Sequence, residues 1–163
     1  MGRHMRVLVI GYGNPSRQDD GVGLAVVNGL RAAASQPLLE EGDDGFNDLG
    51  GSLDTLFLQQ LSPELAETLI DYDHVCLVDA HFGLYPELVH VTPLDPENAP
   101  AIVSHHFKPG TLLALAGELY GRAPTAELIS VRGFSFDFTS ELSPATAEGV
   151  RQVIEELWGR FGV

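Results

Sequence analysis

Three short segments of the chain carry side chains that could bind a metal or transfer a proton. These are the pair Asp19 and Asp20 after a glycine-rich turn, Asp79 at the end of an apolar run, and the pair His105 and His106. Each has an ordinary explanation, because aspartates commonly cap helices and turns and a histidine pair on a loop is usually a surface feature. Taken together, carboxylate oxygens and an imidazole suit a borderline divalent metal such as nickel or zinc.

Hydrophobic patterning places these segments after strands, because short apolar runs alternate along the chain with stretches of helical periodicity. The expected strands are Arg6–Ile10, Thr55–Gln59, His74–Val78, Glu87–Thr92 and Ala126–Val131, and the expected helices are 20–34, one from Ser62, 109–120 and one from Ser143. This order predicts a three-layer α/β/α sandwich with a mostly parallel five-stranded sheet, in which Glu87–Thr92 is an antiparallel edge strand. Ligands of such sheets bind at the carboxyl ends of the strands, so we expect Asp20, Asp79 and a histidine to converge there.

Composition excludes several classes of protein. The chain has 163 residues, with 9 Lys and Arg against 23 Asp and Glu, and its net charge of −14 argues against a nucleic-acid partner. No apolar run approaches the ~20 residues that cross a bilayer, so we expect no membrane insertion. A single cysteine, Cys76, fits a reducing, cytoplasmic location. We interpret residues 1–5 as a cloning remnant or a short arm and residues 6–163 as one domain.

The acidic residues are concentrated in the middle of the chain. Between Ala32 and Phe107 there are 14 acidic residues and no Lys or Arg, and six of these acids lie with four glycines in an insertion at Glu40–Asp54. This composition is typical of a flexible, solvated surface loop. Alternatively, the acidic stretch projects a negative potential toward the metal edge and steers a basic or nickel-bearing partner.

Other chemistries find less support in the sequence. The turn Gly11–Gly13 suggests a dinucleotide site, but Ser16 replaces the third glycine and the following aspartates would repel phosphates. A nucleotide-binding module therefore stays as a secondary interpretation. Cys76 lies within an apolar run and is expected to be a buried structural thiol. The remaining histidines, His74, His81 and His90, show no metal-ligand spacing and are interpreted as ordinary.

The motifs, in this order, resemble those of the hydrogenase maturation proteases, the endopeptidases that remove the C-terminal extension of [NiFe]-hydrogenase large subunits. The resemblance extends from about Arg6 to the final helix. It rests on G-Y-G-N at 11–14, D-D-G-V-G at 19–23, the dipeptide Asp79-Ala80, and a Ser-His segment before a leucine-rich helix. The insertion at Glu40–Asp54 departs from the shorter connection that is usual in this family.

The resemblance implies a site and a substrate. Asp20, Asp79 and His105 would be the catalytic and metal-contacting residues. Counting back from the helix selects His105, whereas counting forward from Ser104 selects His106. The metal would be nickel that the substrate carries, the partner would be the precursor of a [NiFe]-hydrogenase large subunit, and either aspartate could serve as general base. A non-catalytic nickel chaperone would use the same side chains without cleaving a bond.

Overall fold

The computed structural model describes residues 5–95 and 108–162, so His105 and His106 lie outside the described residues. The strands are β1 (Val7–Tyr12), β2 (Leu53–Leu58), β3 (His74–His81), β4 (Val89–Leu94) and β5 (Thr125–Arg132). The helices are α1 (Val22–Ala33), α2 (Leu65–Leu69), α3 (Pro109–Tyr120) and α4 (Pro144–Phe161), with two short 3₁₀ helices, η1 (Gln18–Gly21) and η2 (Phe46–Asp48).

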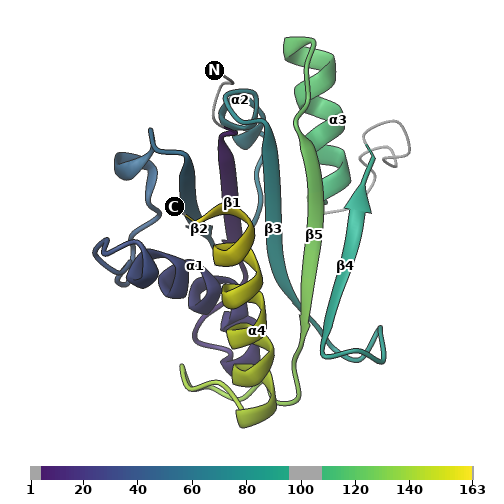
Figure 1. Cartoon of the computed structure of the whole chain (residues 1–163). Coiled ribbons are helices and arrows are strands. Elements are labelled where there is room, and N and C mark those ends of the chain that lie inside the picture. The colour runs from purple at the N-terminus through teal and green to yellow at the C-terminus, as the bar shows by residue number, and fades with distance from the viewer. Residues whose placement is uncertain (1–4, 96–107, 163) are drawn as a thin grey trace.

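All five strands form one sheet in the order β2-β1-β3-β5-β4 (Figure 1). The pairs β1–β2, β1–β3 and β3–β5 are parallel, and β4 runs antiparallel to β5 at one edge. The predicted fold class is therefore confirmed, including the antiparallel edge strand. Although β4 follows β3 along the chain, β5 lies between them in the sheet.

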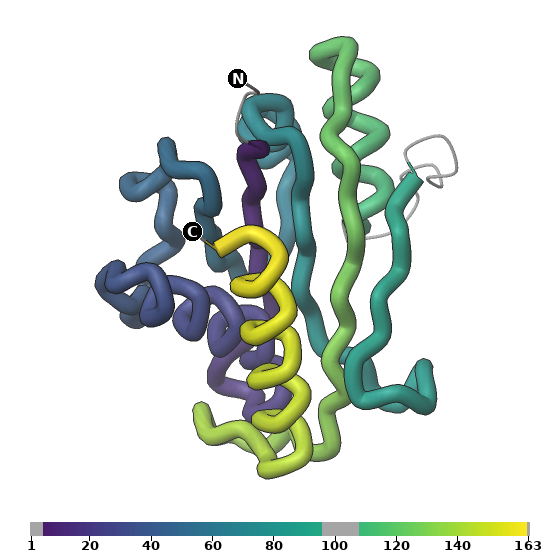
Figure 2. Tube along the Cα trace, in the orientation of Figure 1, coloured from purple at the N-terminus to yellow at the C-terminus, as the bar shows by residue number. Residues whose placement is uncertain are grey.

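Helices cover both faces of the sheet and make it the middle of three layers (Figures 1 and 2). Cys76 and Val78 of β3 pack among residues of α1 and α4. Val75 and Leu77, which alternate with them, pack on the opposite face among residues of α2 and α3. A parallel strand covered on both faces is apolar at successive positions, which explains why its sequence shows a continuous run.

Several element boundaries differ from those that the sequence predicts. Helix α3 has the predicted bounds and ends at Gly121, whose φ of 73° allows the left-handed cap conformation. Helix α2 is shorter than its cap signals suggest. Strand β3 continues past Val78 to His81, so Asp79 lies within the strand rather than after it.

The acidic insertion at Glu40–Asp54 lies along the outer edge of β2. The backbone N–H of Phe57 donates to the carbonyl of Asp44 at 2.9 Å, and Asp48 accepts a hydrogen bond from the buried side chain of Arg31 at 2.6 Å. These contacts cover part of the outer edge of β2. Uncovered backbone groups at such an edge can pair with a strand of another chain.

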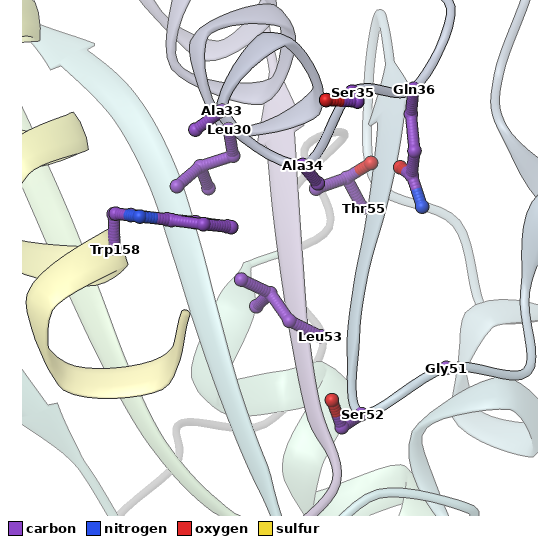
Figure 3. A pocket seen from close by; sticks show the side chains of 10 residues that line it. All are labelled: Leu30, Ala33, Ala34, Ser35, Gln36, Gly51, Ser52, Leu53, Thr55 and Trp158. Carbon is purple, nitrogen blue, oxygen red and sulfur yellow. The ribbon is translucent and has the colours of Figure 1, made fainter. Parts of the chain in front are cut away.

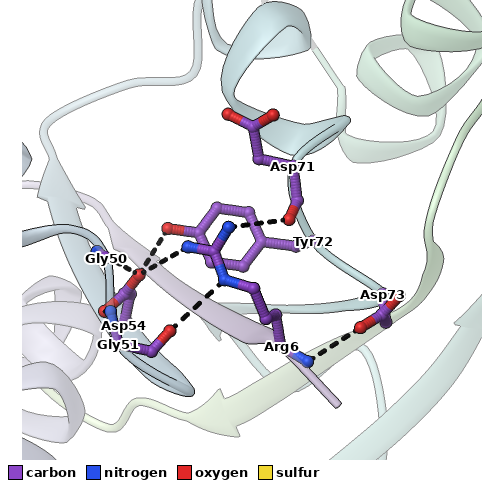
Figure 4. Close-up of polar contacts among 7 residues, drawn as sticks. All are labelled: Arg6, Gly50, Gly51, Asp54, Asp71, Tyr72 and Asp73. Atoms are coloured by element: carbon purple, nitrogen blue, oxygen red, sulfur yellow. Dashed lines mark hydrogen bonds and ion pairs between the residues drawn. The ribbon is translucent and has the colours of Figure 1, made fainter. Parts of the chain in front are cut away.

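Asp54 fixes the far end of the insertion (Figure 4). Its buried carboxylate accepts hydrogen bonds from the Tyr72 hydroxyl at 2.6 Å and from the backbone N–H groups of Gly50 and Gly51 at 2.9 Å each. The guanidinium of Arg6 lies 3.4 Å away and also sits over the Tyr72 ring. The segment thus has more fixed contacts than the expected flexible loop.

In the part of the chain that the structure describes, no helix is long and apolar enough to cross a membrane.

Candidate active site

Asp79 occupies the carboxyl-terminal part of β3, beside Ser130 of the neighbouring strand. Its Oδ1 accepts the Ser130 hydroxyl and its Oδ2 accepts the Tyr12 hydroxyl, each at 2.8 Å. Burial raises the pKa of this carboxyl above its ordinary value, and the negative charge of Asp20 raises it further. The two hydroxyl donors and His81 lower the pKa of Asp79, but their effect is smaller than that of burial.

Asp20 belongs to η1, which connects the end of β1 to α1. Its Oδ2 accepts the backbone N–H of Asn14 at 2.7 Å, which holds the side chain against the turn after β1. A Cβ at Gly13 would lie 2.4 Å from the Asp20 carbonyl oxygen, and the φ of Gly13 is +133°, so only glycine fits there. The structure therefore brings Asp20 and Asp79 to the same edge of the sheet, close enough for one charge to act on the other.

Asp19 has a different role from its neighbour. Its side chain is fully buried and accepts backbone N–H groups of Phe134, Ser135 and Ser143 at 2.8–3.0 Å, together with the Ser143 hydroxyl. Burial raises its pKa, but these donors outweigh burial and hold the pKa below the ordinary value. Asp19 therefore ties the loop after β5 and the start of α4 to η1.

The glycines of the first turn serve packing. A Cβ at Gly11 would lie 2.2 Å from the carbonyl oxygen of Gly23, and one at Gly23 would lie 2.5 Å from the backbone nitrogen of Tyr12. The start of α1 therefore packs directly on the backbone of β1. This close packing accounts for Gly11, one of the glycines that suggested a dinucleotide site, and two carboxylates stand at the helix entrance where phosphates would bind.

His81 is a site residue that the sequence analysis did not single out. It is buried two residues beyond Asp79 on the same face of β3, and its Nδ1 accepts the backbone N–H of Gly83 at 3.1 Å. A neutral ring then carries its proton on Nε2, a buried atom with no hydrogen-bond partner in the described structure. The i, i+2 spacing on a strand is the signal that could have identified it.

An open cavity of about 600 Å³ adjoins these residues. Asp79, His81 and Ser130 contribute its polar wall, and Phe82 and Leu84 contribute its apolar wall. Phe82 and Leu84 are 73% and 76% exposed, so large apolar surface surrounds a carboxyl group with a raised pKa. Such a combination is typical of a site that binds an extended peptide or another partly apolar ligand.

A second cavity, of about 360 Å³, lies between the end of α1, the start of β2 and Trp158 of α4 (Figure 3). Its lining consists of Leu30, Ala33, Ala34, Ser35, Gln36, Gly51, Ser52, Leu53, Thr55 and Trp158. None of these side chains titrates, so this cavity offers no acid, base or strong metal ligand.

Solved structures of known function share this architecture. The chain matches the hydrogenase maturating endopeptidase HybD from E. coli with a TM-score of 0.66 and 20% identity, covering 96% of this chain and 91% of that one. It matches the [NiFe] hydrogenase maturation proteases HycI and HybD from Thermococcus kodakarensis with TM-scores of 0.65 and 0.62 and identities of 20% and 26%. These matches cover 98% and 96% of this chain, and 94% and 99% of the others. No protein-family model and no curated protein sequence matches the chain.

The chain therefore has the fold of the hydrogenase maturation endopeptidases over nearly its whole length. This confirms the structural part of the resemblance that the sequence motifs indicated. The site adds that two of the three residues expected from those motifs, Asp20 and Asp79, lie together at the carboxyl edge of the sheet.

Proposed function

We propose that this protein is an endopeptidase that removes the C-terminal extension of a nickel-loaded [NiFe]-hydrogenase large-subunit precursor. The observation that carries the proposal is the pairing of Asp20 with Asp79 beside an open, partly apolar cavity. The shared fold supports it, because structures with this architecture are named hydrogenase maturation proteases and endopeptidases. We place the reaction in the cytoplasm.

In this proposal the nickel ion arrives with the substrate and contacts Asp20, Asp79 and His105, or His106 if the alignment of the histidine segment shifts by one. Burial, together with the nearby charge of Asp20, raises the pKa of Asp79, so the ionised pair lacks a compensating positive charge. A divalent cation would favour the ionised form of both groups. Recognition then depends on the metal, so a precursor without nickel lacks the cation that the site requires.

The cavity beside Asp79 would bind the peptide segment next to the scissile bond. Phe82 and Leu84 would make apolar contacts with substrate side chains. The N–H at Nε2 of His81 would donate a hydrogen bond to a peptide carbonyl of the substrate. Asp20 or Asp79 would accept a proton from the attacking water, since both are carboxylates close to the proposed metal position.

The test is intact-mass analysis of nickel-loaded and nickel-free precursor after incubation with the protein. We expect the nickel-loaded precursor to lose the mass of its C-terminal extension and the nickel-free precursor to stay unchanged. A nickel-loaded precursor that keeps its mass while nickel passes to or from the protein would replace the proposal with a nickel chaperone.

A further inference from the structure

A second group of metal-ligating side chains lies on the opposite face of the sheet from Asp79. His74 and Cys76 are two residues apart on β3 and face the layer of α4, and Glu127 pairs with Cys76 in the parallel register between β3 and β5. One ligand atom from each residue, an imidazole nitrogen, the thiol sulfur and a carboxylate oxygen, lies within 4.8 Å of the other two. Sequence spacing conceals this group because Glu127 comes from a distant strand.

The hydrogen bonds around His74 fix its tautomer. Thr125 Oγ1 donates its hydrogen to the carbonyl of Asp73 at 3.1 Å, so it must accept the hydrogen bond that it shares with His74 Nδ1 at 2.8 Å. The proton of a neutral imidazole is therefore on Nδ1, and Nε2 presents a lone pair. This is the arrangement found in metal-bound histidines, whose other ring nitrogen donates to a neighbouring oxygen.

That lone pair faces another acceptor. His74 Nε2 is buried without a hydrogen-bond partner in the described residues, and the nearest carboxylate oxygen, Oε2 of Glu127, is 3.7 Å away. Two acceptors at this separation repel each other unless a cation or a proton lies between them. The thiol of Cys76 is fully buried and donates a hydrogen bond to Glu127 Oε1, with 3.6 Å between sulfur and oxygen. Its sulfur is the third potential metal ligand of the group.

The other oxygen of Glu127 has its own partner. Arg160 of α4 donates to Glu127 Oε1 at 2.7 Å, and its second nitrogen lies 3.4 Å from Oε2. This contact orients the carboxylate, as partners of metal ligands commonly do. Phe161, the last residue of α4, packs against the His74 ring with 5.6 Å between centroids and shields the group from solvent.

We propose that His74, Cys76 and Glu127 bind one borderline divalent ion, of the class of Zn²⁺, which links β3 to β5 beneath the end of α4. The donor set of nitrogen, sulfur and oxygen suits this class, and three protein ligands leave a fourth position for water. The thiolate is the form of cysteine that binds a metal, so binding releases the Cys76 proton to solvent. The site is independent of the proposed peptidase activity and of the nickel that the substrate carries.

The test is titration of the chelator-treated protein with Co²⁺, a spectroscopic substitute for Zn²⁺. We expect a sulfur-to-cobalt charge-transfer band at one equivalent, its displacement by Zn²⁺, and a higher melting temperature with Zn²⁺ bound. Cys76→Ser should remove the band, and Glu127→Gln should weaken binding. Thr125→Val keeps all three ligands but should lower the Zn²⁺ affinity about tenfold or more, because it releases Nδ1 of His74.

The double variant Asp20→Asn with Asp79→Asn is the matched control. It should keep the cobalt band because Asp79 lies on the other face of the sheet and Asp20 lies in η1, which follows β1. Circular dichroism of each metal-free variant verifies that it is folded. Absence of the charge-transfer band in the folded wild-type protein would overturn the proposal. A band that persists in folded Cys76→Ser would also overturn it, and would leave a protonated His74 paired with Glu127 as the explanation of the geometry.

Discussion

Asp19 and Asp20 are consecutive residues of η1, yet their carboxylates have opposite surroundings. Asp19 is fully buried and accepts hydrogen bonds from the loop after β5 and from the start of α4. Asp20 is partly exposed at the carboxyl edge of the sheet, where it accepts a hydrogen bond from Asn14, and its charge acts on Asp79. The position of Asp20 at the site thus depends on the contacts of Asp19.

Two single variants, Asp19→Asn and Asp20→Asn, should affect different properties: the first the stability of the fold, the second the processing activity. Asp19→Asn places an amide group among several N–H donors, so we expect it to lower the free energy of unfolding by about 3 kcal/mol. Asp20→Asn should change stability by less than about 1 kcal/mol and lower processing of nickel-loaded precursor by orders of magnitude, because it removes a charge that the cation needs. Urea unfolding and intact-mass kinetics measure the two effects. Full activity in Asp20→Asn would exclude this residue from the site.

Asp79→Asn should stabilise the protein at neutral pH while it abolishes processing. Burial raises the pKa of Asp79 in the folded state, so folding favours the protonated carboxyl. The stability that this protonated group contributes is complete below the unfolded pKa of about 3.9, and it is lost as pH rises through the folded pKa. A neutral amide avoids that loss and can still hydrogen-bond to Tyr12 and Ser130. Thermal melts at pH 7 should show a gain of several degrees that shrinks toward pH 4. An equal difference at both pH values would contradict this origin.

The histidine segment offers a test of alignment. We expect His105→Ala to abolish processing and His106→Ala to reduce it only mildly, because counting back from α3 selects His105. Both residues lie outside the described residues, so kinetics with the nickel-loaded precursor decides between them. The reverse result would shift the assignment by one residue, and two fully active variants would remove the histidine from the proposed site.

The acidic insertion should influence processing only at low ionic strength. It lies beyond β2, which is two strands from Asp79, so its charges act over at least ~10 Å. The screening length is about 8 Å at 0.15 M salt and about 30 Å at 0.01 M. We expect Glu40→Gln with Glu41→Gln to slow processing about twofold at 0.01 M salt and to match wild type at 0.15 M.

These two glutamates are exposed, and their side chains make no hydrogen bond or ion pair within the described residues, so their replacement leaves the anchors of the insertion intact. A control variant with Glu67→Gln and Glu118→Gln removes the same charge from α2 and α3. Equal rates for both variants at every salt concentration would leave only the solubility interpretation of the insertion.

The sequence predicts the fold well because its signals are local. Apolar runs, Pro144 after Ser143 and Gly121 after a leucine-rich stretch define strands and helix ends without knowledge of the tertiary structure. The edge position of β4 was predictable from the sequence, but its pairing with β5 was not. The residues of β4 carry no local signal that identifies which strand pairs with it.

The site shows the same division. Asp20 and Asp79 are identified by their positions near strand ends, whereas the structural role of Asp19 depends on donors more than a hundred residues away. His81 could have been identified from its i, i+2 spacing to Asp79 on one strand. The group of His74, Cys76 and Glu127 is identified only when β3 and β5 bring these side chains together. The anchoring of the insertion through Asp54 and Tyr72 is likewise a contact between distant segments.

The strand order has a consequence for the protein during its own synthesis. β4 (Val89–Leu94) leaves the ribosome before β5 (Thr125–Arg132), and β5 is the strand with which it pairs. Until β5 has emerged, the nascent chain can assemble β1, β2 and β3, but its last strand has no partner. Completion of the sheet, and with it the placement of Ser130 against Asp79, is therefore a late event of translation. A chain that stops before Thr125 would leave the edges of β3 and β4 that pair with β5 without a partner.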